Sequence, residues 1–139
     1  MADLVVSEWR SGRDIRVRDL RGTVVLLDIW ASWCAPCKEE MPLLDDMARR
    51  LRGEDVEIVA VSIDEDRGAA EEFLRTKKTW ALTLAHDPQG RVPDRLKPAK
   101  MPTSYVIDAR GVLRQVTAGF ERGDIARLEA RLRALAQTP

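Results

Sequence analysis

The sequence predicts an α/β fold in which strands and helices alternate along the chain. Two apolar runs rich in β-branched residues, at 24–29 and 56–63, flank a segment whose apolar residues recur at helical spacing. A strand, a helix and a strand in this order imply a right-handed crossover between parallel strands. Because 139 residues are the usual size of one domain, we expect a single domain over residues 1–139.

The run at 24–29 is expected to be a buried strand, and a helix follows it. The helical pattern begins at Cys34 and stops at Gly53, a residue that commonly ends helices. Pro42 lies inside this pattern and should bend the helix, because proline removes one hydrogen bond and crowds the preceding turn. The run at 56–63 is expected to be the second buried strand.

The remaining elements are shorter. In chain order we expect a helix at 69–77, a strand at 82–85, at most one helical turn near 91–96, an antiparallel hairpin of 103–107 with 112–116, and a helix at about 124–136. The last helix has an apolar stripe on one side, and Asp124 is placed to act as its N-cap.

Composition excludes several classes of function. Lysine plus arginine and aspartate plus glutamate are each 23, so the sequence offers no basic field for nucleic acid. No apolar run approaches the 18 residues of a membrane helix. The start of the sequence lacks the charged and apolar regions of a signal peptide, so we expect either a cytosolic protein or one whose targeting segment is absent from this chain.

Cys34 and Cys37 are the only cysteines, and they stand at the expected start of the first helix. A bridge between them would close so small a loop that it adds roughly 2 kcal/mol of stability, against about 4.7 for a 100-residue loop. One turn of helix places the two sulfurs on one face, where a disulfide can open and close with little backbone movement. The pair therefore favours redox chemistry over a structural role.

A buried structural cysteine pair or half of a zinc site is the alternative. Structural zinc takes four protein ligands, and catalytic zinc takes three with water. His86 is the one other soft or borderline ligand in the chain, so a site within one subunit would need carboxylates to complete it. We expect no metal and no cofactor besides the redox-active disulfide between Cys34 and Cys37.

The chain resembles the thioredoxin superfamily, and more narrowly the TlpA/ResA-like thiol-disulfide oxidoreductases of bacteria. Four segments in the same order carry the resemblance from about Val17 onward: the run 30–37 after its strand, the segment 38–42, the segment 101–103, and the turn 107–111. The resemblance implies a thioredoxin-like fold, with a central mixed sheet flanked by helices. It also implies an extra helix and strand, here 69–77 and 82–85, inserted between the CxxC helix unit and the cis-proline hairpin.

The family mechanism makes Cys34 the attacking thiolate and Cys37 the resolving thiol. The residue nearer the start of the helix feels more of the field of its unpaired N–H groups, which agrees with these roles. Opening a substrate disulfide forms a mixed disulfide with Cys34, and Cys37 then displaces the reduced substrate.

Asp28 and Glu40 are candidates for managing the proton on Cys37. Thioredoxins carry a buried aspartate six residues before the first cysteine, and ResA-like proteins carry a functional glutamate six residues after it. Where thioredoxins usually pair the aspartate with a lysine, this chain aligns Ala60, which should raise the pKa of Asp28. The alternatives are a structural role for Asp28 and an exposed position for Glu40.

The resemblance also implies a substrate-binding surface around the cysteines. Its members are Trp33, Ala35, Pro36, Met101 and Pro102. Pro102 stands where the superfamily carries a cis proline, and the backbone of Met101 would pair with an extended substrate segment. Without the resemblance, Pro102 is an ordinary proline at the entry to a strand.

The sequence thus predicts a thiol-disulfide oxidoreductase that acts on protein disulfides, most simply as a reductase. A thiol peroxidase is one alternative, although Ala31 stands where peroxiredoxins usually carry threonine or serine. A binding or chaperone module of the same fold is another. The direction of electron flow is open, because the dipeptide between the cysteines does not fix a potential.

The expected partners are a disulfide-containing protein substrate and an electron-donating thiol partner, and no nucleic acid. We expect a monomer without a membrane span. By resemblance the protein works outside the cytoplasm, in a periplasmic or other extracytoplasmic space, with a cytoplasmic location as the alternative.

Overall fold

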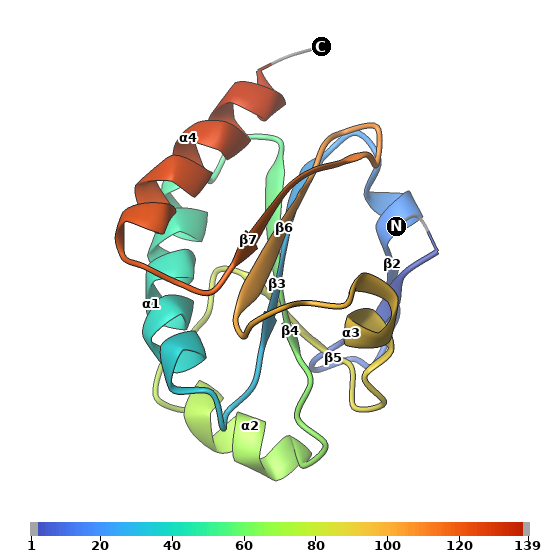
Figure 1. The fold of residues 1–139 in the computed structure, drawn as a ribbon, viewed down its shortest axis with the longest axis vertical. Helices are drawn as coiled ribbons and strands as arrows, with labels where there is room; N and C mark the ends of the chain where they lie inside the picture. Colours follow the sequence, from blue (N-terminus) through green and yellow to red (C-terminus); the bar gives the residue numbers. More distant parts are fainter. Residues whose placement is uncertain (1–2, 138–139) are drawn as a thin grey trace.

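The computed structural model describes residues 3–137, in which seven strands form one sheet. In chain order they are β1 (Val5–Glu8), β2 (Asp14–Arg16), β3 (Val24–Trp30), β4 (Val56–Ser62), β5 (Thr83–His86), β6 (Thr103–Ile107) and β7 (Leu113–Ala118). Across the sheet the order is β2-β1-β5-β4-β3-β6-β7 (Figure 1). The central strands β3, β4 and β5 are parallel to one another, whereas β6 is antiparallel to β3, so the sheet is mixed.

The helices cover both faces of this sheet. They are the 3-10 helix η1 (Val17–Leu20) and the α-helices α1 (Ala35–Arg50), α2 (Arg67–Leu74), α3 (Arg91–Leu96) and α4 (Gly123–Ala136). Helices α1 and α4 lie side by side on one face, α3 lies on the other, and α2 lies near the end of the sheet where α1 begins (Figure 1). None of the helices within residues 3–137 has the length and apolar character needed to cross a membrane.

The predicted α/β architecture is confirmed in its central part. Every residue of β3 is buried, because helices and loops cover the strand on both faces. Side chains alternate along the strand, so Leu26 and Trp30 belong to the core under α1, while Leu27 and Ile29 belong to the core on the opposite face. The parallel pairing of β3 with β4 brings Asp28 directly beside Ala60.

Helix α1 begins as the sequence predicts. Cys34 is its N-cap, and Pro36 falls in the first turn, where a missing N–H costs no helical hydrogen bond. The helix continues through Pro42 to Arg50. The bend expected at Pro42 stays a prediction.

The inserted elements and the hairpin are also present. Helix α2 and strand β5 stand between β4 and the hairpin of β6 and β7, and β5 joins the sheet between β1 and β4. Strands β1 and β2 pair with each other at one edge of the sheet. One expectation was wrong: Arg122 rather than Asp124 is the N-cap of α4, and the Asp124 carboxylate instead accepts a hydrogen bond from the N–H of Glu121.

Candidate active site

Cys34 and Cys37 form a disulfide at the start of α1, with their Cα atoms 5.3 Å apart. The Cys37 backbone N–H donates to Cys34 Sγ at 3.3 Å, so this sulfur lies within the field of unpaired N–H groups at the helix terminus. Cys34 is 6% exposed to solvent, whereas Cys37 is fully buried. Of the two cysteines, Cys34 is therefore the one closer to solvent.

The residues around the disulfide differ in how they face solvent. Trp33 is the most exposed large apolar residue of the described chain, at 66%, and Ala35 and Pro36 are exposed beside it. Trp30 is buried, and its ring lies 5.3 Å from that of Phe73. The end of β3 thus places Trp30 in the core, and the turn after it places Trp33 on the surface next to Cys34.

Met101 and Pro102 lie at the same end of the sheet as the disulfide. The antiparallel register places Thr103, the first residue of β6, opposite Ile29 near the end of β3. The Met101–Pro102 peptide bond is cis, as the sequence resemblance predicts. Met101 packs against the core cluster that contains both cysteines.

Asp28 and Glu40 are both buried, although charged residues seldom are unless they are paired. Asp28 lies between Leu26 and Trp30 on β3, so its side chain faces the core under α1. Burial raises the pKa of Asp28 to about 6. Burial also raises the pKa of Glu40, and the nearby Asp28 charge raises it further. An exposed position for Glu40 is thereby excluded.

The two carboxyl groups share a site that favours a single negative charge. Ser104 Oγ donates a hydrogen bond of 2.9 Å to Asp28 Oδ1. Asp28 Oδ2 and Glu40 Oε1 are buried without a partner among the described residues. A proton on Glu40 would supply the donor that this arrangement lacks, and it would favour the Asp28 carboxylate. The pair can therefore hold or release one proton near neutral pH.

A family model described as the AhpC/TSA family matches residues 3–116. The chain belongs to the AhpC/TSA family. The matched region includes both cysteines, the carboxyl groups of Asp28 and Glu40, and the cis proline. It also includes β1 and β2, which lie before the segment on which the sequence resemblance rests.

Relatives and solved structures are similar to the chain over most of its length. The thiol-disulfide oxidoreductase ResA of Oceanobacillus iheyensis is 35% identical over 114 residues, which are 82% of this chain and 59% of ResA. A crystal structure from Chlorobium tepidum, assigned as a thiol:disulfide interchange protein DsbE, is 33% identical. It superposes with a TM-score of 0.88 over 96% of this chain and 93% of its own. The exposed lipoprotein thioredoxin Etrx1 of Streptococcus pneumoniae is 26% identical, with a TM-score of 0.77 over 94% of this chain and 100% of its own.

These likenesses confirm the thioredoxin-like fold and the ResA-like resemblance. The chain spans 59% of the length of the ResA protein from Oceanobacillus iheyensis. No group of three or more histidine, cysteine, aspartate or glutamate side chains within residues 3–137 is arranged as a metal site.

Sequence reasoning missed three further buried carboxylates, which are Asp45, Asp64 and Asp87. Asp45 on α1 is fully buried and forms ion pairs with Lys77 and Arg49. Asp64 follows β4, is 2% exposed, and accepts hydrogen bonds from Ser32, two residues before Cys34. A signal for Asp64 was available, because it stands just after the carboxyl end of a buried parallel strand, where functional side chains often gather.

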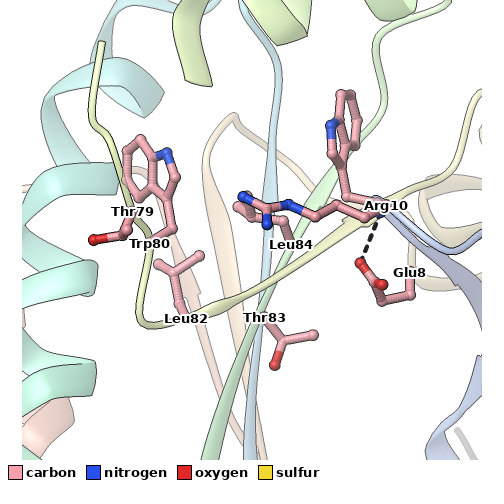
Figure 2. Close-up of a pocket in the computed structure, with 8 residues that line it drawn as sticks. Glu8, Arg10, Thr79, Trp80, Leu82, Thr83 and Leu84 are labelled. Carbon is pink, nitrogen blue, oxygen red and sulfur yellow. Dashed lines mark hydrogen bonds between the residues drawn. The ribbon is translucent and has the colours of Figure 1, made fainter. Parts of the chain in front are cut away.

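A separate pocket lies away from the cysteines. It has a volume of about 380 Å³, and Figure 2 shows the Arg10 side chain reaching across it above Leu84, with Trp80 beyond. Its walls come from the end of β1, from β5 and from residues 79–82. None of the predicted site residues lines it.

Proposed function

We propose that this protein is a thiol-disulfide oxidoreductase that reduces protein disulfides through Cys34 and Cys37. The observation that carries the proposal is the disulfide at the N-terminus of α1, with Cys34 as N-cap and as the less buried of the two cysteines. The relative ResA, named as a thiol-disulfide oxidoreductase, supports the same activity.

The reaction proceeds in two exchanges. The Cys34 thiolate attacks one sulfur of a substrate disulfide, forms a mixed disulfide, and releases the other substrate sulfur as a thiolate. Cys37 then loses its proton and attacks Cys34 Sγ, which forms the Cys34–Cys37 disulfide and releases the second substrate thiolate. Two electrons pass to the substrate, and a dithiol partner restores the pair by the reverse exchanges.

Asp28 and Glu40 are proposed to take the proton from Cys37. Both cysteines belong to the core cluster that includes Leu26 and Trp30. Asp28 lies between Leu26 and Trp30 along β3, so its side chain faces the same cluster. With its pKa raised to about 6, Asp28 is ionised near neutral pH and still basic enough to accept a proton. Glu40 supplies a neutral carboxyl group that steadies the Asp28 charge.

Protein substrates are proposed to bind along the surface formed by Trp33, Ala35, Pro36, Met101 and Pro102. The indole of Trp33 offers an exposed apolar contact, and Met101 offers an adaptable one. The backbone beside the cis bond can pair with an extended segment, which holds its disulfide near Cys34.

We place the protein outside the cytoplasm and expect it to act as a monomer. The Streptococcus pneumoniae relative is described as an exposed lipoprotein. A disulfide persists more readily in an oxidising compartment. Labelling of the reduced cysteines in intact cells by a membrane-impermeant maleimide tests the location, and thiols that react only after lysis would contradict it.

Reduction of insulin by dithiothreitol tests the activity. The wild-type protein should accelerate the precipitation of insulin, and Cys34→Ser should not. Hydrogen peroxide consumption with the same thiol should stay at the rate of buffer, which separates the proposal from a thiol peroxidase. A wild-type protein that leaves insulin reduction unchanged would contradict the proposed function.

A further inference from the structure

The turn that delivers Cys34 to α1 is held by a carboxylate from another part of the chain. The Cys34 N–H donates to the Ala31 carbonyl at 3.1 Å, which closes residues 31–34 into a turn. The Ser32 N–H lies 3.0 and 3.2 Å from the two carboxylate oxygens of Asp64, and Ser32 Oγ donates to Asp64 Oδ1 at 2.5 Å. One side chain thus accepts both the backbone and the hydroxyl donor of this turn.

Asp64 is itself fixed in place. Ser62 Oγ donates to Asp64 Oδ2 at 2.6 Å, and the Asp64 N–H donates back to Ser62 Oγ at 3.1 Å. His86 Nε2, at the end of β5, lies within hydrogen-bond distance of the Asp64 carbonyl at 2.9 Å. The His86 ring packs against Trp9 with centroids 5.0 Å apart. The inserted strand and the N-terminal segment therefore brace the loop that carries Asp64.

We propose that Asp64 is a positioning residue that keeps the turn 31–34 in place when the Cys34–Cys37 disulfide opens. The proposal deepens the proposed function and rests on it. In the oxidised protein the S–S bond ties Cys34 to α1. In the dithiol that tie is gone, and the hydrogen bonds from Ser32 to Asp64 continue to anchor the turn. Cys34 then stays beside Cys37, so the disulfide re-forms at a smaller cost in chain entropy.

A simpler role for Asp64 would be support of the fold alone, and Asp45 provides the matched control. Asp45 is also fully buried and is bound by two backbone N–H groups and by Lys77 and Arg49. These four partners lie outside the turn 31–34. Asp45→Asn should therefore lower thermal stability without changing how easily the disulfide forms.

The equilibrium with glutathione measures the proposed effect. The protein dithiol and glutathione disulfide give the protein disulfide and two glutathione thiols, so atoms and electrons balance. We expect Asp64→Asn to lower this equilibrium constant about tenfold, which is about 30 mV toward a more oxidising couple. Ser32→Ala should lower it roughly threefold, since the N–H contacts remain. Ser32→Ala keeps the carboxylate, so its shift cannot arise from lost charge near Cys34.

The equilibrium constant of Asp45→Asn with glutathione should stay within about twofold of the wild-type value. The proposal is overturned if the equilibrium constants of Asp64→Asn and Ser32→Ala both stay within that range. It is also overturned if the constant of Asp45→Asn changes as much as theirs. Amide hydrogen exchange at Ser32 in the dithiol form gives a second readout that needs no exchange activity. It should accelerate in Asp64→Asn and not in Asp45→Asn, and equal protection in all three proteins would contradict the proposal. A wild-type protein inactive on insulin would count against the proposed function instead.

Discussion

Asp28 and Ser104 face each other across β3 and β6, and Ser104 Oγ donates a hydrogen bond of 2.9 Å to Asp28 Oδ1. This bond lowers the pKa of a carboxyl group that burial raises. Ala60, which pairs with Asp28 on the neighbouring strand β4, has no charged side chain that could stabilise the carboxylate. The proton affinity of Asp28 is thus set by burial, one hydroxyl and Glu40.

Ser104→Ala should raise the pKa of Asp28 further, because the carboxylate loses a donor that favours its charged form. If Asp28 accepts the proton of Cys37, the acid limb of the pH–rate profile should move up by roughly half to one pH unit. Thr117→Ala removes a hydroxyl from the residue that pairs with Ser104 on β7 and is the control. An acid limb that stays at the wild-type pH in Ser104→Ala would exclude Asp28 as the acceptor.

Removing both carboxyl groups should slow exchange more near neutral pH than at high pH. In the Asp28→Asn/Glu40→Gln double variant, Cys37 has no internal acceptor, but above its own pKa it loses the proton to water. Insulin reduction measured from pH 6 to 10 checks this expectation. A profile of wild-type shape would show that neither group handles the proton.

The raised pKa of Glu40 also predicts how stability depends on pH. A carboxyl group whose pKa is higher in the folded state binds more protons there, so the free energy of unfolding falls as pH rises above its unfolded pKa of about 4.3. Glu40→Gln removes this pH-dependent fall in the free energy of unfolding. The change in that free energy caused by the substitution should therefore be more favourable at pH 7 than at pH 4, by about 1 kcal/mol or more. Urea unfolding at the two pH values measures the difference.

Glu39→Gln, on the exposed side of the same turn of α1, is the control. Equal effects of Glu40→Gln at pH 4 and pH 7 would mean that Glu40 is ionised in the folded protein.

The central fold could be predicted because its information is local. The run at 24–29 is apolar throughout, and the helical spacing after Cys34 is regular, so β3 and α1 follow from pattern alone. The cis bond before Pro102 followed from the resemblance, since no local pattern separates it from an ordinary strand entry.

The rest depends on partners distant in sequence. Asp64 is buried because Ser32, on another loop, meets its carboxylate, and a charged residue is otherwise expected at the surface. Strands β1 and β2 carry short, mostly polar sequences because they form an edge of the sheet and face solvent in part. Their pairing is visible only once the sheet is assembled.

The roles of the two sulfurs can be separated by substitution. Cys34→Ser should abolish exchange, because it removes the proposed attacking sulfur, which caps α1. Cys37→Ser should accumulate mixed disulfides with substrate, because attack survives and resolution does not. Non-reducing electrophoresis after incubation with a disulfide-bonded substrate detects these mixed disulfides. Trapping by Cys34→Ser instead would reverse the roles.

The pH dependence of Cys34 alkylation by iodoacetamide, in a Cys37→Ser background, tests whether Cys34 is a nucleophile activated by the start of α1. The unpaired N–H groups there favour the thiolate, while apolar neighbours such as Met101 and the Asp28 charge oppose it. We expect the helix terminus to dominate, since Cys34 caps the helix and is the less buried of the two cysteines. The alkylation midpoint should therefore lie below the ordinary cysteine value of about 8.5, and a midpoint above about 8.5 would contradict the proposed role of Cys34.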